Sequence, residues 1–121
     1  MRSETGMAVG TDVAARISFR AGGSAANTAR SFARLDGSAV FVGTAGDDRL
    51  GARLTASLRS DGVEVHAVTL TGSSPRLLVT IDSTGERSFL TDRGVANRLT
   101  ARAIRASWLA RVDAVHVPVY S

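Results

Sequence analysis

This 121-residue chain has no cysteine, no lysine and no long apolar run, and each of these absences excludes a class of protein. There is no cysteine, which excludes a disulfide framework, a thiolate metal site and a cysteine nucleophile. There is no lysine, which excludes the P-loop that cradles ATP phosphates in many proteins. No apolar run approaches the roughly 20 residues that cross a bilayer, and the N-terminus lacks the apolar core of a signal peptide. We therefore expect a cytoplasmic protein with no membrane partner.

Aromatic residues make up only 5% of the sequence, and histidine occurs twice. Common RNA-binding domains stack bases on aromatic side chains, and the aromatic residues of this chain form no such platform. His66 and His116 lie in apolar-flanked segments, where a core or edge position is commoner than a metal ligand. We predict no metal site in this chain.

The charge balance is basic, with a net charge of +4 and an isoelectric point near 11.2. Such a balance can indicate nucleic-acid binding. However, the arginines are spread from Arg2 to Arg111 and no two are adjacent, whereas a nucleic-acid surface usually concentrates its charge. The pattern favours genome-wide codon bias, and we predict no nucleic-acid partner.

The length accommodates a single domain over residues 1–121. Apolar residues spaced by three and four predict helices, and short apolar runs predict buried strands. The main elements are expected at 25–35, 49–60 and 100–111 for helices, and at 39–42, 63–68 and 113–119 for strands. This alternation is typical of an α/β domain with a parallel sheet. Because such sheets normally have five or more strands, three candidate strands make this sheet look incomplete.

Polar residues mark the ends of the predicted helices. Asp36 and Gly37 end the first helix, because both tolerate a left-handed backbone. After a loop at 43–48, Asp47 or Asp48 can cap the second helix. Thr100 is expected to cap the third helix, whose inward face would carry Ile104, Trp108 and Leu109.

Two further segments do not follow this alternation. Residues 13–20 alternate loosely between apolar and polar positions, which predicts a short strand with one wet face. Residues 76–81 and 87–91 flank a polar loop and predict an antiparallel hairpin. These segments are expected to form a small separate sheet. Arg76 could enter a substrate cleft from the hairpin, although a solvated strand arginine is commoner.

The most informative stretch is the turn Gly22-Gly23-Ser24-Ala25-Ala26-Asn27, between a predicted strand and a predicted helix. Two glycines let a ligand approach the backbone closely, and free N–H groups at a helix start favour electron-rich oxygens. Asn27 offers both a donor and an acceptor, so the combination suits a neutral polyol. A tight turn into a closely packed helix, with Asn27 only capping it, explains the same six residues. These residues alone leave both interpretations open.

An ordered set of short blocks extends this turn along the chain. The set comprises Gly22–Ala29, Ala33-Arg34-Leu35, Phe41-Val42-Gly43, Gly46-Asp47-Asp48, Leu50-Gly51, Asp61-Gly62-Val63, Gly85-Glu86-Arg87, Gly94-Val95-Ala96-Asn97 and Leu99-Thr100. In this order and spacing it resembles the ribokinase/PfkB family of carbohydrate kinases over about residues 12–121. The resemblance implies an incomplete three-layer, ribokinase-like (Rossmann-like) parallel sheet with helices. It also implies a small antiparallel β lid formed by residues 13–20 and 76–91.

The same resemblance implies a substrate site. In the family, the glycine pair and the asparagine bind sugar hydroxyls, which assigns Gly22, Gly23 and Asn27 here, with Ser24 lining the turn. The intact family enzyme uses ATP and Mg²⁺ to phosphorylate a sugar or nucleoside hydroxyl, and its lid keeps out water that would hydrolyse ATP. No residue of this chain is identified as a ligand of ATP or Mg²⁺.

The sequence departs from the family pattern at both ends. The family's first core strand should precede residue 1, and its catalytic aspartate and ATP pocket should follow residue 121. Thr44-Ala45-Gly46-Asp47 is similar to the catalytic signature, but its position matches an N-terminal block, so no catalytic residue is assigned. Asp47 and Asp48 are expected to be caps rather than a metal pair. Tyr120 replaces a sugar-contacting carboxylate of some members, which leaves the sugar open.

Two hypotheses follow from these observations. The first is the sugar-side portion of an ATP-dependent carbohydrate kinase, inactive as this chain alone. The alternative is a non-catalytic binding or dimerisation remnant of such a kinase. Because an exposed strand edge recruits another strand, the alternative predicts a homodimer through the lid strands or the sheet edge.

Overall fold

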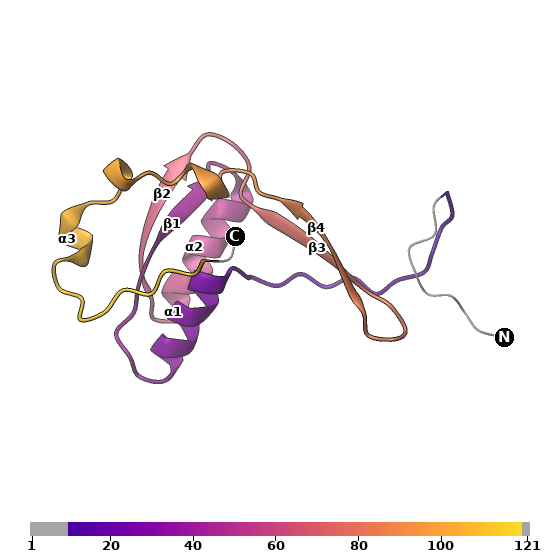
Figure 1. The fold of residues 1–121 in the computed structure, drawn as a ribbon, viewed down its shortest axis with the longest axis horizontal. Coiled ribbons are helices and arrows are strands. Elements are labelled where there is room, and N and C mark those ends of the chain that lie inside the picture. Colours follow the sequence, from indigo (N-terminus) through magenta and orange to yellow (C-terminus); the bar gives the residue numbers. More distant parts are fainter. Residues whose placement is uncertain (1–9, 120–121) are drawn as a thin grey trace.

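A parallel pair of strands and two helices form the centre of the molecule (Figure 1). The computed structural model describes residues 10–119. β1 (Val40–Gly46) pairs in parallel with β2 (Glu64–Leu70). α1 (Ser24–Arg34) precedes β1, and α2 (Arg49–Ser60) connects β1 to β2. The α/β class predicted from the sequence is confirmed.

The hydrophobic core lies between the two helices and one face of this sheet. Ala26 of α1, Leu58 of α2 and Val63 are buried at its centre. Phe41 and Val65 are register partners on neighbouring strands and pack against these three residues. Because alternate strand residues point to opposite faces, both share the face that the helices cover.

The opposite face of the sheet is covered by the segment that follows the hairpin. The His66 ring stacks on Trp108 with ring centroids 4.7 Å apart. The Thr44 hydroxyl donates a hydrogen bond of 3.1 Å to the carbonyl of Val95, which is 1% exposed. This third layer contains only short helices: the 3₁₀ turns η1 (Ala96–Arg98) and η2 (Ala101–Ala103), and α3 (Ala106–Leu109).

An antiparallel hairpin projects from this body (Figure 1). β3 (Arg76–Ile81) pairs with β4 (Arg87–Asp92), which confirms the predicted hairpin. Its apolar side chains are between 40% and 66% exposed: Leu77, Leu78, Val79, Ile81, Phe89 and Leu90. The hairpin therefore presents apolar surface that the rest of residues 10–119 does not cover.

The ends of the two long helices also follow the sequence prediction. Asp48 caps α2, with its carboxylate accepting a hydrogen bond from the Gly51 N–H. Asp36 takes the left-handed backbone, with φ of 62°, after α1. Asp61 has a role that the sequence did not suggest: it forms ion pairs with Arg30 and Arg34 and so joins the end of α2 to α1. Within residues 10–119, no helix is long and apolar enough to cross a bilayer.

Two predictions about the N-terminal half are wrong. The loop predicted at 43–48 begins too early, because β1 continues through Gly46 in register with Leu70. The strand predicted at 13–20 does not form, and Ile17 and Phe19 are 74% and 95% exposed. A strand needs a hydrogen-bonded neighbour, and within residues 10–119 no strand pairs with this segment. Figure 1 shows it as irregular backbone that extends from the start of α1.

Two predictions about the C-terminal part are also wrong. The helix predicted at 100–111 is interrupted at Arg105, whose ψ of 132° is extended, and Thr100 makes no side-chain cap. The strand predicted at 113–119 does not form, and Val117 is 74% exposed. Short helices and lone strands are marginal without an apolar surface to pack on. The parallel sheet in residues 10–119 therefore has two strands. Tyr120, where some family members have a sugar-contacting carboxylate, lies outside the described residues.

We predict that the exposed hairpin makes the isolated chain self-associate. Open edges with apolar side chains recruit other strands. Sedimentation velocity should show species larger than a monomer, and replacing Leu78 and Phe89 by serine should shift the distribution towards the monomer. A monodisperse wild-type monomer with a sharp, cooperative thermal transition would contradict this prediction.

Candidate functional site

The glycine turn before α1 has the geometry of an open binding turn. Gly23 is the N-cap residue with φ of 100° and ψ of 128°, a backbone conformation that side-chain-bearing residues rarely adopt. A Cβ atom placed on Gly22 would meet nothing within 4 Å. No side chain caps α1, so the backbone N–H groups of its first turn are available to an incoming oxygen.

Ser24 and Asn27 lie beside this turn on α1. The Asn27 N–H donates to the Gly23 carbonyl over 2.8 Å, which starts the helical hydrogen bonding. The Asn27 side chain is exposed, and its Oδ1 accepts a hydrogen bond of 3.3 Å from Arg30. The Ser24 carbonyl accepts a hydrogen bond from the Thr28 hydroxyl. The structure thus brings all four predicted substrate-binding residues to one end of α1.

If the glycine turn binds a sugar beneath the lid, a pocket should lie between Asn27 and the hairpin, but the hollow beside Asn27 lies elsewhere. It has a volume of about 420 Å³ and is lined by Asn27, Thr28, Ser31, Phe32 and Leu35. All five residues belong to α1 or its C-cap, and no hairpin residue lines the hollow. The predicted pocket between the glycine turn and the lid is therefore not closed in this structure, and the substrate-binding role of the turn stays a prediction.

A second polar cluster joins α2, the end of β1 and the base of the hairpin. The hydroxyl of Ser74, which is fully buried, donates to Asp48 Oδ1 over 2.7 Å and accepts from the Gly46 N–H over 3.0 Å. The Ser74 N–H donates to Asp48 Oδ2 over 2.9 Å. At 3.5 Å, Arg76 makes a weaker contact with the same carboxylate. Gly46 and Gly51 must be glycines here, because a Cβ on either would collide with neighbouring backbone.

These contacts determine what the two aspartates can do. The hydrogen bonds from the Ser74 hydroxyl, the Ser74 N–H and the Gly51 N–H hold the pKa of Asp48 well below its ordinary value. Asp47 Oδ1 accepts a hydrogen bond of 3.0 Å from the Gly72 N–H. Asp48 is thus the predicted cap of α2. Asp47 is not a helix cap as predicted, because its carboxylate accepts from the Gly72 N–H in the loop before the hairpin. Ser74 itself was missed, since no local pattern distinguishes it from the serine before it.

A comparison with known families identifies the chain's relatives. The model described as "pfkB family carbohydrate kinase" matches residues 3–119. The chain belongs to this family. The resemblance inferred from the ordered motifs is thereby confirmed.

Individual relatives agree with this membership. Fructokinase-1 from Zea mays is 36% identical over 99 residues, which cover 78% of this chain and 31% of that protein. The adenosine kinase structure from Sinorhizobium meliloti is 34% identical with a TM-score of 0.68, covering 74% of this chain and 28% of that one. A putative ribokinase II from E. coli is only 20% identical with a TM-score of 0.74, covering 89% and 36%, and shows the ribokinase-like fold. The chain thus spans about a third of the length of these pfkB-type proteins.

We predict that Ser74→Ala destabilises the fold by about 1–3 kcal/mol, because it leaves the buried Gly46 N–H without its acceptor. Chemical denaturation monitored by circular dichroism measures the change. Ser73→Ala is the matched control, since the Ser73 hydroxyl shows no hydrogen bond within residues 10–119. Equal effects of the two substitutions would contradict the role assigned to Ser74.

We also predict an acid-sensitive contribution from Asp48. Because its pKa in the folded state lies below the ordinary 3.8, its stabilising contribution is present above that value and is lost as the pH falls towards the folded-state pKa. Asp48→Asn should therefore lower the melting temperature near neutral pH and have a smaller effect in strong acid. A melting-temperature difference that does not change between these conditions would contradict this assignment.

Proposed function

We propose that this pfkB-family chain provides the sugar-side portion of an ATP-dependent kinase that phosphorylates a hydroxyl of a sugar or nucleoside. The observation that carries the proposal is the open N-terminus of α1, where Gly23 replaces a side-chain cap and Asn27 lies one turn away. A polyol both donates and accepts hydrogen bonds, and this turn offers both functions. The fructokinase and adenosine kinase relatives support the choice of ligand class.

Each predicted residue has a distinct proposed role. Gly22 and Gly23 leave space for the sugar to approach the backbone, and Ser24 adds a hydroxyl at the start of the helix. Asn27 would donate from its amide nitrogen and accept at its oxygen, because its contact with Arg30 is long and exposed. The hairpin β3–β4 would close over the sugar. Closure would cover both the sugar and the exposed apolar side chains.

Kinases of this family use ATP, and we propose no ligand of Mg²⁺ among the described residues. Within residues 10–119 there is no cluster of three or more histidine, aspartate or glutamate side chains suited to a metal ion. The carboxylates of Asp47 and Asp48 are engaged by backbone N–H groups. We assign no step of phosphoryl transfer to these residues. We propose that the chain alone has no kinase activity. We also propose that it is located in the cytoplasm.

A binding or dimerisation role is the second candidate. The exposed apolar hairpin favours it, because such a strand pair can be covered by the hairpin of a second copy. The two candidates differ in one property: only the kinase portion needs the glycine turn to bind a sugar.

We predict that Asn27→Ala weakens the binding of sugar or nucleoside by about tenfold, the ratio that corresponds to one lost hydrogen bond of about 1.4 kcal/mol. Titrations of the chain with fructose and with adenosine, followed by amide NMR shifts, measure the affinity. Asn97→Ala is the matched control, because Asn97 is an exposed asparagine in η1. Absence of binding by the wild-type chain, or equal binding by both variants, would favour the dimerisation role.

A further inference from the structure

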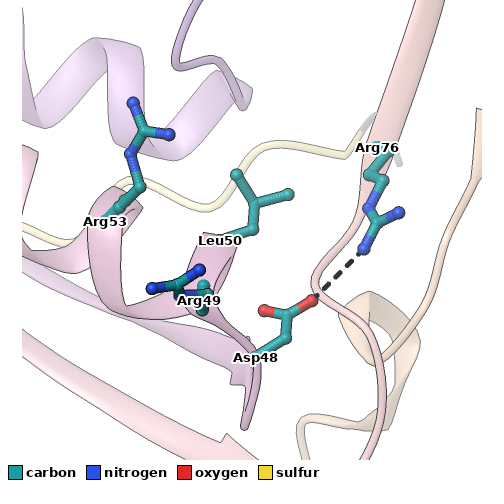
Figure 2. A pocket seen from close by; sticks show the side chains of 5 residues that line it. All are labelled: Asp48, Arg49, Leu50, Arg53 and Arg76. Atoms are coloured by element: carbon teal, nitrogen blue, oxygen red, sulfur yellow. Dashed lines mark hydrogen bonds and ion pairs between the residues drawn. The ribbon is translucent and has the colours of Figure 1, made fainter.

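We infer a binding site for a phosphate group between α2 and the base of the hairpin. A hollow of about 440 Å³ lies there, lined by Asp48, Arg49, Leu50, Arg53 and Arg76 (Figure 2). The first four residues come from the N-terminal turns of α2, and Arg76 is the first residue of β3. The volume falls in the range of small-molecule sites.

The charges around the hollow are not balanced. Three arginines line the hollow with a single carboxylate, that of Asp48, which is already engaged by Ser74 and Gly51. In Figure 2 only Arg76 is directed at this carboxylate. The contact of Asp48 with Arg76 is the longest of the set, at 3.5 Å. Neither Arg49 nor Arg53 pairs with a carboxylate within residues 10–119. The hollow therefore has two arginines without an anionic partner and a third that is weakly paired.

The position of these arginines adds to the imbalance. Arg49 and Arg53 are four residues apart on α2, a spacing that places like charges on the same face and destabilises a helix. They also lie at the end where the helix dipole is positive, and although Asp48 at the N-cap is acidic, the first turn of α2 holds no acidic residue. A bound anion would relieve both repulsions. Packing does not account for the two arginines, because both are exposed.

The chemistry of the lining favours phosphate over a neutral ligand. The planar fork of a guanidinium matches two phosphate oxygens at once, and a neutral sugar would gain little from three cations. Leu50 lies between Arg53 and Arg76 in Figure 2 and provides one apolar wall. The ligand is thus free phosphate or the phosphate group of a small phosphorylated molecule. None of the lining residues belongs to the glycine turn, so this inference does not rest on the proposed function.

Occupation of the hollow would also connect two elements. An anion that contacts Arg53 on α2 and Arg76 on β3 would hold the base of the hairpin against the body. In this structure, the contact of 3.5 Å between the Arg76 guanidinium and the Asp48 carboxylate joins the start of α2 to Arg76. Phosphate binding should therefore stabilise the hairpin as well as neutralise the arginines.

The test is a titration of the full chain with inorganic phosphate at constant ionic strength, followed by amide NMR shifts. We expect saturable binding, with shifts in the first turns of α2 and at the start of β3. The double variant Arg49→Gln, Arg53→Gln should bind at least about tenfold more weakly, because each charge-assisted hydrogen bond contributes about that ratio. Arg59→Gln is the matched control: it removes an arginine from the last turn of the same helix, outside the hollow.

Further ligands and variants identify the source of the phosphate. Tighter binding of fructose 6-phosphate than of inorganic phosphate would assign the site to a phosphorylated sugar, and equal affinities would assign it to free phosphate. Fructose serves as the neutral control, and its failure to bind would concern the glycine turn rather than this hollow. Arg76→Gln gives an independent variant if the double variant does not fold. The inference is overturned if chloride reproduces the phosphate shifts, if binding does not saturate, or if Arg59→Gln weakens binding as much as the double variant.

Discussion

The buried hydroxyl of Ser74 is the contact on which the arrangement of the other elements depends. It accepts from the end of β1 and donates to Asp48, which caps α2, while the chain continues from Ser74 into the hairpin. Three elements are thereby joined at one point. A buried hydroxyl without partners would be costly, so both of its hydrogen bonds must form together. This requirement determines the position of the hairpin base relative to α2, and so the walls of the hollow beside it.

A second constraint is the shortage of covering surface. One face of the β1–β2 sheet is well covered, because the small side chains of α1 let it approach closely around Ala26. The hairpin has no such cover, and its apolar residues stay half exposed. This contrast explains why the chain has a compact centre of two helices and a sheet, while segments 13–20 and 113–119 lack regular structure. Folding can order only those parts that find partners.

The N-termini of α1 and α2 are built in opposite ways. α1 begins with Gly23 and no side-chain cap, which leaves polar N–H groups beside the neutral Asn27. α2 begins with Asp48 as its cap, followed by Arg49 and Arg53. The first arrangement suits the hydroxyls of a sugar, and the second suits a charged group. Under our two proposals, the same backbone feature would bind two different kinds of ligand, because the residues around it differ.

The sequence by itself determined the elements whose stability is local. Helices α1 and α2 and the hairpin could be predicted because their apolar spacing and turn residues lie within or next to the elements, and because Asp48 directly precedes α2. The grouping of Gly22, Gly23, Ser24 and Asn27 follows for the same reason, since one turn of helix brings them together. Family membership was also predictable from the order of the short motifs, and the family match confirms it.

Only the tertiary structure decided the rest. The segments 13–20, 100–111 and 113–119 have strand or helix patterns, but such patterns form regular structure only when another element packs on them or pairs with them. Ser74 meets Asp48 across 26 residues and Arg30 meets Asp61 across 31, so neither contact has a local signal. The hollow of Arg49, Arg53 and Arg76 likewise exists because the fold places the start of β3 beside α2. Contacts between distant residues depend on how the chain packs, and local spacing does not specify that packing.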